Sequence, residues 1–225
     1  MKADLFKMDL AVDDEALLKK NTMEKKIKRA ADFAISILLL IIVCPLLVCA
    51  CIAIRIESKG SAIYRQKRYG FCGREFIAYK LRTMYEHSSD GNLAAPKAGD
   101  TRVTRVGKIL RKTSIDELPQ LFNVLHGDMS ILGPRAVPYK EIELRLENMI
   151  KSNPEQEGQF RRAMEIRMLM RPGISGMAQA YGRSALTAKE ATGYDVYYVM
   201  YYSLLLDIRI FFKTIDTILF RKGVN

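Results

Sequence analysis

Tryptophan is absent from the sequence, and histidine is nearly absent, with two residues in 225. Of the four cysteines, Cys44, Cys49 and Cys51 lie within one apolar run, and Cys72 stands alone. This spacing fits neither a disulfide framework nor a zinc site, because thiol and imidazole ligands are not grouped. We therefore expect reduced cysteines with structural roles in a protein that faces the cytoplasm.

Acidic residues are also scarce. The chain has 25 Asp and Glu against 36 Lys and Arg, which gives a formal net charge of +11. Such an excess indicates an anionic partner, which is a nucleic acid, an anionic membrane surface or a phosphorylated substrate. A nucleic-acid platform interleaves basic and aromatic residues, whereas the tyrosines here crowd into residues 194–202, apart from the arginines. We therefore expect no nucleic-acid partner.

Charge is missing altogether from residues 33–54, the one long apolar run of the chain. As a helix, this run would extend about 33 Å, which is enough to cross a bilayer. Pro45 lies in its middle and cannot donate a hydrogen bond to the carbonyl oxygen of Ile41. We therefore expect the helix to bend at Pro45.

Basic residues flank the apolar run on both sides, with Lys28 and Arg29 before it and further lysines and arginines after it. The positive-inside rule therefore selects no orientation. A helix that enters, bends and returns to the same face removes the conflict. We predict such a re-entrant membrane helix over residues 24–58, with a straight span as the alternative. Residues 1–23 are predicted to form a flexible tail without a cleavable signal peptide.

The remaining residues, 59–225, are predicted to form a single membrane-associated domain. Strand patterns at residues 61–66 and 75–84 flank a glycine-marked turn and predict a small β-hairpin, with Lys80 and Arg82 on one face. Most of the rest has helical periodicity, including two amphipathic segments within residues 138–170. The expected fold class is α+β, mainly helical, with interfacial amphipathic helices around the domain.

Residues 112–120, Lys-Thr-Ser-Ile-Asp-Glu-Leu-Pro-Gln, place two adjacent carboxylates, Asp116 and Glu117, ahead of an apolar helical pattern. Ser114 and Glu117 have the spacing of a capping box, in which Glu117 would only start a helix. Pro119 weakens this interpretation, because it would remove a hydrogen bond from the helix interior. A helix that begins near Asp116 tolerates Pro119 and places both carboxylates at its N-terminus. Capping and chemistry remain evenly balanced on these residues alone.

Arginines stand on both sides of the two carboxylates, with Arg111 before them and Arg135 after them. Arginine binds phosphate oxygens with paired hydrogen bonds, while carboxylates bind divalent cations or act as nucleophiles. The pattern therefore indicates a site that handles a phosphate group together with a metal ion.

From Lys28 to its C-terminus, the chain resembles the bacterial sugar transferases, in particular the small monotopic phosphoglycosyl transferases. Cys44 replaces the serine that this family usually has before the kink proline, and further departures fall at Ala136, Met177 and Tyr181; none of them removes a catalytic candidate. The motifs that carry the resemblance occur in the family's order: Lys28-Arg29 before a proline-broken apolar helix, Tyr79 to Met84, Arg111 to Gln120, Gly127 to Ser130, Gly133 to Arg135, Arg171 to Gly176, Gln179, Gly182-Arg183 and Asp195 to Val199.

The resemblance implies an initiating transferase that moves a sugar-1-phosphate from a UDP-sugar to undecaprenyl phosphate and releases UMP. The reaction would proceed by a ping-pong mechanism through a phosphosugar on Asp116. Glu117, together with Asp116, would bind Mg²⁺ as the cofactor. Substrate and phosphate contacts carry over to Lys80, Arg111, Arg135, Arg183 and Asp195, and membrane roles carry over to Lys28, Arg29 and Pro45.

The resemblance also implies a monotopic protein at the cytoplasmic face of the bacterial inner membrane, with membrane lipid as a partner. It would catalyse the first membrane step of polysaccharide or glycoconjugate synthesis. The sugar, the glycan pathway, the oligomeric state and the role of the helical insert at residues 145–170 stay open. One alternative is a non-catalytic, basic, membrane-tethered binding protein, which would not need the carboxylates. A second is a one-step transferase in a membrane-spanning protein.

Overall fold

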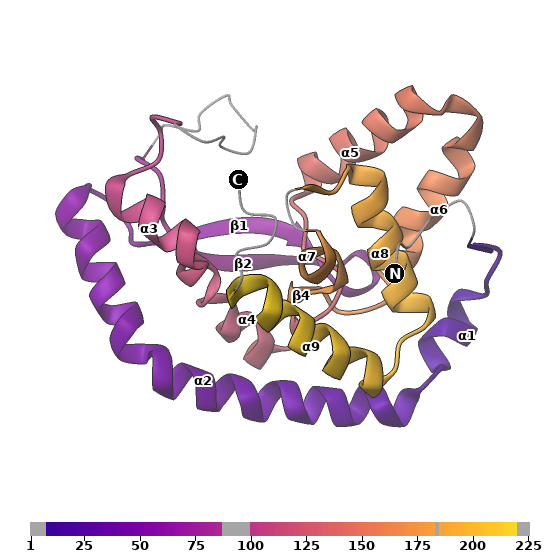
Figure 1. Cartoon of the computed structure of the whole chain (residues 1–225), viewed down its shortest axis with the longest axis horizontal. Coiled ribbons are helices and arrows are strands. Elements are labelled where there is room, and N and C mark those ends of the chain that lie inside the picture. The colour runs from indigo at the N-terminus through magenta and orange to yellow at the C-terminus, as the bar shows by residue number, and fades with distance from the viewer. Residues whose placement is uncertain (1–7, 87–99, 183–184, 220–225) are drawn as a thin grey trace.

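The computed structural model describes residues 8–86, 100–182 and 185–219, and Figure 1 shows the arrangement of the elements. The described chain is mainly helical, with one antiparallel hairpin and one short parallel strand pair, so the expected α+β class is confirmed. The strands are β1 (Ile63–Tyr69), β2 (Glu75–Leu81), β3 (Ser130–Leu132) and β4 (Gly173–Ser175), and 3₁₀ turns occur at η2 (Phe71–Gly73), η3 (Ile115–Glu117) and η4 (Pro154–Gln156). The helices are α1 (Asp14–Lys19), α2 (Thr22–Glu57), α3 (Arg105–Thr113), α4 (Gln120–His126), α5 (Tyr139–Ser152), α6 (Glu157–Arg167), α7 (Met177–Tyr181), α8 (Ala188–Met200) and α9 (Leu204–Leu219).

The longest element is α2, which continues through Pro45 without interruption. Figure 1 shows it as a long arc that runs beneath the other elements and curves upward beside α3. By length and composition α2 could cross a membrane, with a mean hydropathy of 3.3 over its most apolar stretch, of which 11% is buried in the protein. Large apolar side chains exposed along this middle part are Ile37, Leu38, Ile41, Ile42, Leu46 and Val48.

Lys28 and Arg29 hold the N-terminal end of α2 against the domain. The buried ammonium group of Lys28 donates a hydrogen bond to Asp207 of α9 at 2.8 Å. The guanidinium group of Arg29 donates to the carbonyl oxygens of Val124 and Leu125, at 2.6 and 3.1 Å, near the C-terminus of α4. Since the last carbonyls of a helix have no partner within it, Arg29 caps α4. The basic pair expected to flank the membrane therefore makes its contacts within the protein.

The C-terminal end of α2 is held by the same domain. Arg82, just after β2, donates to the carbonyl oxygens of Ser58 and Lys59 at 2.8 and 2.5 Å. Ile54 packs into a buried cluster that includes Leu110 of α3. Both ends of the apolar helix are thus attached to one folded body, while its middle part is left exposed.

The predicted hairpin is confirmed. β1 and β2 pair antiparallel, with Tyr64 opposite Lys80 and Arg68 opposite Phe76, although β1 extends to Tyr69 and β2 already ends at Leu81. β3 and β4 pair in parallel and were not predicted. Each has three residues, which is too short to leave a periodic pattern in the sequence.

The main core lies where α6 packs on α8. Phe160 and Ile166 of α6 and Val196 and Tyr198 of α8 are each fully buried. The two amphipathic segments predicted within residues 138–170 are confirmed as α5 and α6. The tyrosine cluster contributes chiefly to this core, as the burial of Tyr198 illustrates. The hydroxyl group of Tyr198 donates a hydrogen bond to Asp207 at 2.7 Å.

Residues 8–20 differ from the flexible tail that the sequence indicated. Leu10 and Leu17 belong to the main buried cluster, so this segment contributes apolar surface to the core. Arg162 of α6 donates to two backbone carbonyl groups of the segment and, at 2.6 Å, to the carboxylate of Asp14. We call residues 8–20 the N-terminal arm.

Arg162→Ala should release the N-terminal arm. Each charge-assisted hydrogen bond contributes about 1.5 kcal/mol, so trypsin cleavage after Lys19 or Lys20 should become about tenfold faster or more. The rate of limited proteolysis measures this release. Arg161→Ala is the matched control, because Arg161 pairs with Glu157 on the surface of the same helix. Equal cleavage rates in the two variants would show that Arg162 does not retain the arm.

Candidate functional site

The carboxylates Asp116 and Glu117 lie in the 3₁₀ turn η3, between α3 and α4. Ser114 ends α3 in the left-handed region, with φ 58°, and its side chain caps neither element. The capping-box interpretation is therefore wrong. The expectation that a helix begins near Asp116 is also wrong, because α4 starts only at Gln120, with Pro119 as its N-cap. The left-handed Ser114 separates the turn from α3, and Pro119 separates it from α4.

Glu117 is held by two cations from distant segments. Its Oε1 atom accepts a hydrogen bond from Lys80 Nζ at 2.6 Å and from Arg135 Nη2 at 3.2 Å. Burial alone would raise the pKa of Glu117, but the charges of Arg135 and Lys80 outweigh it and lower the pKa to about 2. Glu117 is therefore a carboxylate at every physiological pH.

Asp116 has the opposite electrostatic environment. Burial, together with the neighbouring charge of Glu117, raises the pKa of Asp116 to about 6, against the lowering effect of Lys80 and Arg111. Within the described residues, no side chain donates a hydrogen bond to its carboxylate. Two adjacent carboxylates with pKa values pushed apart are typical of an acid–base or nucleophilic site.

Arg111 reaches the site from the last turn of α3. Its Nε atom donates to the hydroxyl group of Thr83 at 2.8 Å, which orients the guanidinium group. Burial lowers the pKa of Arg111, while the charge of Asp116 raises it, so the two side chains interact electrostatically. The structure thus brings together Lys80, Arg111 and Arg135 around the two carboxylates, as the sequence predicted.

Arg68 is a buried cation near the site that the sequence analysis did not select. It lies on β1, donates through Nη1 to the carbonyl oxygen of Ala136 at 2.5 Å, and contacts Gln66 through Nε and Nη2. Burial and the charge of Arg135 lower the pKa of Arg68 to about 10. The alternation of Gln66 and Arg68 on one face of a strand was the available signal. Arg68 fixes the backbone next to Arg135.

Asp195 lies behind Arg135 and is fully enclosed. Its carboxylate accepts a hydrogen bond from Arg167 at 2.6 Å and a longer one, of 3.4 Å, from the backbone N–H of Arg135. Arg167 in turn donates to the carbonyl oxygen of Arg135 at 2.8 Å. Asp195 thus supports the backbone of Arg135, and its substrate contact stays a prediction. Arg183, the remaining predicted phosphate ligand, lies outside the described residues.

The donor set fits a divalent cation that is shared with a substrate. Among the described residues, no cluster of three or more Asp, Glu, His or Cys side chains could enclose a metal ion. Mg²⁺ commonly uses one or two carboxylates and completes its coordination with substrate phosphates and water. Asp116 and Glu117 supply such a pair, although Oε1 of Glu117 is already engaged by Lys80 and Arg135.

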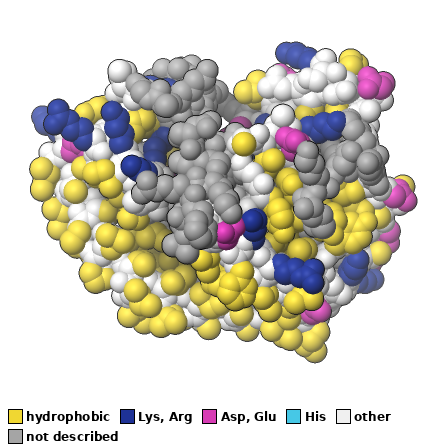
Figure 2. All heavy atoms as spheres, in the orientation of Figure 1, with side chains coloured by type: hydrophobic (Ala, Val, Ile, Leu, Met, Phe, Trp, Pro, Cys, Tyr) yellow, Lys and Arg dark blue, Asp and Glu magenta, His cyan; other side chains and the backbone are white. Residues whose placement is uncertain are grey.

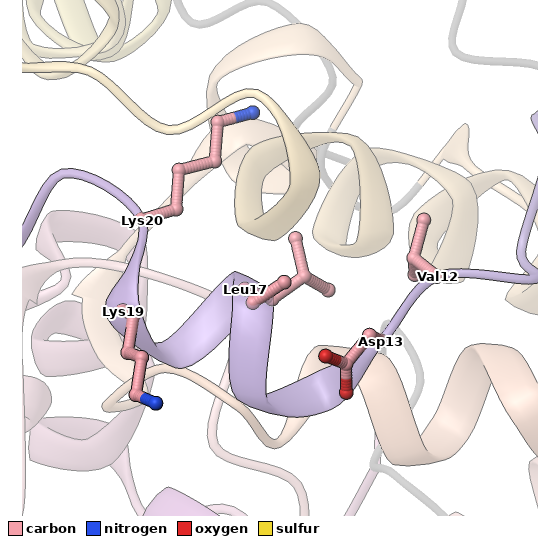
Figure 3. Close-up of a pocket in the computed structure, with 6 residues that line it drawn as sticks. Val12, Asp13, Leu17, Lys19 and Lys20 are labelled. Carbon is pink, nitrogen blue, oxygen red and sulfur yellow. The ribbon is translucent and has the colours of Figure 1, made fainter.

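An open hollow on the described surface lies away from the carboxylates. It has a volume of about 520 Å³, is wide open, and lies against α1, where Val12, Leu17 and Lys20 are among the residues that line it (Figure 3). A second space, of about 10 Å³, is lined by Arg135 and Arg167. Because the first hollow is lined neither by the two carboxylates nor by the cations around them, chemistry rather than volume identifies the site.

The chain is similar to known proteins over most of its length. A model of the family described as bacterial sugar transferase matches residues 23–221. UDP-N-acetylgalactosamine-undecaprenyl-phosphate N-acetylgalactosaminephosphotransferase of Aeromonas hydrophila is 40% identical over 208 residues, which are 88% of this chain and 45% of the relative. UDP-glucose:undecaprenyl-phosphate glucose-1-phosphate transferase of Klebsiella pneumoniae is 36% identical over 87% of this chain and 40% of the relative. Exopolysaccharide production protein ExoY of Sinorhizobium fredii is 36% identical over 87% of each chain. The chain therefore spans less than half the length of the first two relatives and most of the third.

Asp116→Asn should raise the melting temperature at pH 8. The pKa of Asp116 is about 6 in the folded protein, above its ordinary value of 3.8. Its contribution to stability is therefore present below pH 3.8 and lost as the pH rises through 6. The variant has no such loss, so its advantage over the wild type should be clear at pH 8 and small at pH 4. Thermal unfolding at both pH values measures this difference, and an equal shift at both would contradict it.

Glu117→Gln should have the opposite effect. The pKa of Glu117 is about 2 in the folded protein, so its contribution to stability is present above its ordinary pKa of 4.5 and lost as the pH falls through 2. At pH 8 the substitution leaves Lys80 and Arg135 without their carboxylate and should lower the free energy of unfolding by about 3 kcal/mol. Denaturant titration measures this loss. Glu143, an exposed glutamate on α5, provides the control variant Glu143→Gln, which should lose little stability. If Glu117→Gln loses no more than this control, the prediction is contradicted.

Proposed function

Because the chain belongs to the bacterial sugar transferase family, we propose that it transfers a sugar-1-phosphate from a UDP-sugar to undecaprenyl phosphate and releases UMP. Two relatives are named for this reaction, one with N-acetylgalactosamine and one with glucose. A third is named for exopolysaccharide production, so we place the reaction at the first membrane step of polysaccharide or glycoconjugate synthesis. The relatives differ in their sugar, so the sugar of this protein is left open.

One observation carries the proposal. Asp116, with a pKa of about 6, lies beside Glu117, with a pKa of about 2, and both are surrounded by Lys80, Arg111 and Arg135. A carboxylate of raised pKa is more basic than usual and still ionised at neutral pH, as a nucleophile requires. The surrounding cations match the charge of a diphosphate, which develops further negative charge as it breaks.

In the first step, a carboxylate oxygen of Asp116 attacks the β-phosphorus of the UDP-sugar. The bond from this phosphorus to the oxygen that bridges the two phosphates breaks, and UMP departs with the electron pair. The phosphosugar remains on Asp116 as an acyl phosphate. Arg135 contacts Glu117, and the charge of Arg111 acts on Asp116, so both arginines can bind the phosphate oxygens and favour the charge on the leaving group.

In the second step, a phosphate oxygen of undecaprenyl phosphate attacks the same phosphorus. The acyl-phosphate bond breaks, the carboxylate of Asp116 is restored, and undecaprenyl-diphospho-sugar leaves. Neither step changes the protonation of the enzyme, because both nucleophiles and both leaving groups are anionic oxygens. A covalent intermediate lets one site serve a soluble donor and a lipid acceptor in turn, which gives ping-pong kinetics.

We assign Mg²⁺ to this site as a cofactor shared with the substrate. Bound Mg²⁺ would neutralise the diphosphate and its leaving group. Glu117 and Asp116 would hold it, and Lys80 and Arg135 keep Glu117 ionised and fixed in orientation. Arg183 is proposed as a further phosphate ligand, and Asp195 acts by holding the backbone of Arg135.

We propose that the protein is monotopic and lies at the cytoplasmic face of the bacterial inner membrane. In this arrangement α2 is a re-entrant helix. The contacts of Arg29 with α4 and of Arg82 with residues 58 and 59 attach both ends of α2 to one domain, which supports a helix that leaves the bilayer on the side where it entered. Hydrophobic side chains gather along the lower edge of the molecule, over α2 and beside α9 (Figure 2). Exposed apolar residues on α9 include Leu205, Ile208, Phe211 and Phe212, and an apolar surface of this kind suits the membrane interface.

The covalent step predicts a labelled protein. When the purified enzyme is given a UDP-sugar with a radioactive β-phosphate and no lipid acceptor, the protein should carry label after denaturation, and Asp116→Asn should carry none. Asp216→Asn is the control, because Asp216 pairs with Lys213 on α9. Label on Asp116→Asn would exclude Asp116 as the nucleophile, and no label on the wild type would exclude the covalent step. Turnover without labelling would favour a one-step transferase, and lipid binding without turnover would favour a binding protein.

The re-entrant helix predicts that both ends of α2 lie on the same side of the membrane. Lys26 and Lys59, which are exposed near these ends, are replaced singly by cysteine in a protein whose four native cysteines are replaced by alanine. A membrane-impermeant maleimide should label both positions in inverted inner-membrane vesicles and neither in spheroplasts. Labelling of the two positions from opposite sides would establish a straight span instead.

A further inference from the structure

The last residue of α2, Glu57, reaches across to the first turn of α3. Its Oε1 atom accepts a hydrogen bond from the backbone N–H of Arg105 at 2.7 Å, and its Oε2 atom accepts one from Val106 at 2.9 Å. Burial alone would raise the pKa of Glu57, but these two N–H groups, together with the side chain of Thr104 and the charge of Arg105, outweigh it and lower the pKa. A carboxylate at a helix N-terminus also interacts favourably with the helix dipole.

The contact completes the hydrogen bonding of this helix terminus. The first four N–H groups of a helix lack partners within the helix. Here Thr104 N–H donates to the carbonyl oxygen of Thr83 at 3.1 Å, and Gly107 N–H donates to the side chain of Thr104 at 2.8 Å. The two groups between them both donate to Glu57. Helix α2, which is distant in sequence, therefore supplies the acceptor for two of the four N–H groups at the N-terminus of α3.

α3 leads directly to the catalytic turn. Arg111 lies in its last turn, Ser114 ends it, and Asp116 follows in η3. α3 also packs closely on the chain beside it, because a Cβ atom at Gly107 would lie 2.1 Å from the carbonyl oxygen of Thr83. A helix so rigidly packed transmits a shift at its N-terminus to its C-terminus, where Arg111 and Asp116 lie.

The opposite end of α2 is attached to the element that follows the dyad. Arg29 caps the C-terminus of α4, and Asp32 accepts hydrogen bonds from Ser130 and Ile131 of β3, at 2.6 and 3.3 Å. β3 leads to Arg135. The two ends of the membrane helix are therefore bound to the segments on either side of Asp116 and Glu117, so the curvature of α2 and the spacing of these segments are mechanically linked.

We propose that Glu57 is a positioning residue that couples the seating of α2 in the bilayer to the placement of Arg111 and Asp116. The coupling rests on the proposed function, because it states what the membrane does to the first chemical step. Bilayers of different thickness tilt a spanning helix to different extents, and we expect them likewise to change the depth and the bend of a re-entrant helix. Through Glu57, that change reaches α3 and alters the alignment of the nucleophile with the β-phosphorus.

The test measures the first half-reaction in vesicles of phosphatidylglycerol with short, intermediate or long acyl chains. A single turnover of UMP release from the UDP-sugar is followed without undecaprenyl phosphate, so that thickness cannot act through the lipid acceptor. The wild-type rate should depend on chain length. Glu57→Gln should be about tenfold slower at the optimal thickness, since a misplacement of 1 Å can cost about a hundredfold, and its rate should no longer depend on chain length.

Thr104→Ala is the matched control for the coupling. It removes a cap from the same helix terminus, at a cost of about 1 kcal/mol, together with the hydrogen bond of the Thr104 side chain to Glu57, but leaves the hydrogen bonds from the Arg105 and Val106 N–H groups to Glu57 in place. Its UMP release should keep the thickness dependence of the wild type, even where the rate is lower. If Glu57→Gln keeps that dependence as Thr104→Ala does, Glu57 is only a local cap and the coupling is excluded. A wild-type rate that does not depend on thickness also excludes it.

Arg105→Pro removes one donor instead of the acceptor. Proline is tolerated at the first position of a helix, and Thr104 already has the extended conformation, with ψ 164°, that proline requires of the residue before it. The variant should lose part of the thickness dependence, whereas Arg105→Gln, which removes only the charge, should keep it. This pair remains informative if Glu57→Gln fails to fold. Equal dependence in the two Arg105 variants would contradict the coupling.

Hydrogen–deuterium exchange of residues 105–117 in the same vesicles separates the two proposals. Protection of these amides should vary with acyl-chain length in the wild type and not in Glu57→Gln. Thickness-dependent exchange without UMP release would overturn the proposed function and leave the coupling in place. If UMP is released but amide exchange does not vary with acyl-chain length, the coupling alone is overturned.

Discussion

The contact of Glu117 with Lys80 and Arg135 is the interaction on which the rest of the site depends. It joins three segments that are remote in sequence: the second strand of the hairpin, the turn η3 and the loop after β3. A charge buried without a partner costs several kcal/mol, so these three groups stabilise the protein only while they remain together. Their mutual pairing therefore fixes the positions of the segments relative to one another, and with them the position of Asp116.

The same arrangement separates the roles of two adjacent residues. The cations neutralise Glu117 and keep its pKa low, whereas the charge of Glu117 and burial raise the pKa of Asp116. One carboxylate is thus suited to hold cations and the other to act as a base or nucleophile, although a single peptide bond separates them. The opposite pKa shifts arise from burial and from the partners of each side chain, because Glu117 contacts Lys80 and Arg135 directly, whereas burial and the charge of Glu117 dominate at Asp116.

Support for the site comes from buried polar contacts on several sides. Arg68 holds the carbonyl group of Ala136, while Asp195 and Arg167 hold the N–H and carbonyl groups of Arg135. The membrane helix α2 contributes through its ends, and its exposed apolar middle makes few contacts with the domain. Under the proposed function, the site for a lipid phosphate would in this way be built on the helix that enters the bilayer.

Several properties follow from the sequence by itself, because they depend on composition and short spacing: the apolar run around Pro45, the excess of basic residues, the hairpin and the pair of carboxylates between arginines. The order of the motifs also identified the family. Other properties were decided only by the tertiary structure. The sequence suggested a helix start at Asp116 and a flexible arm, whereas the structure has a 3₁₀ turn and a packed segment, and only the structure shows the buried pairing of Asp195 with Arg167. The physical reason is that the role of a charged or apolar side chain depends on its partner. The partners of Asp195, Arg68 and Leu10 lie in segments that only the folded chain brings together.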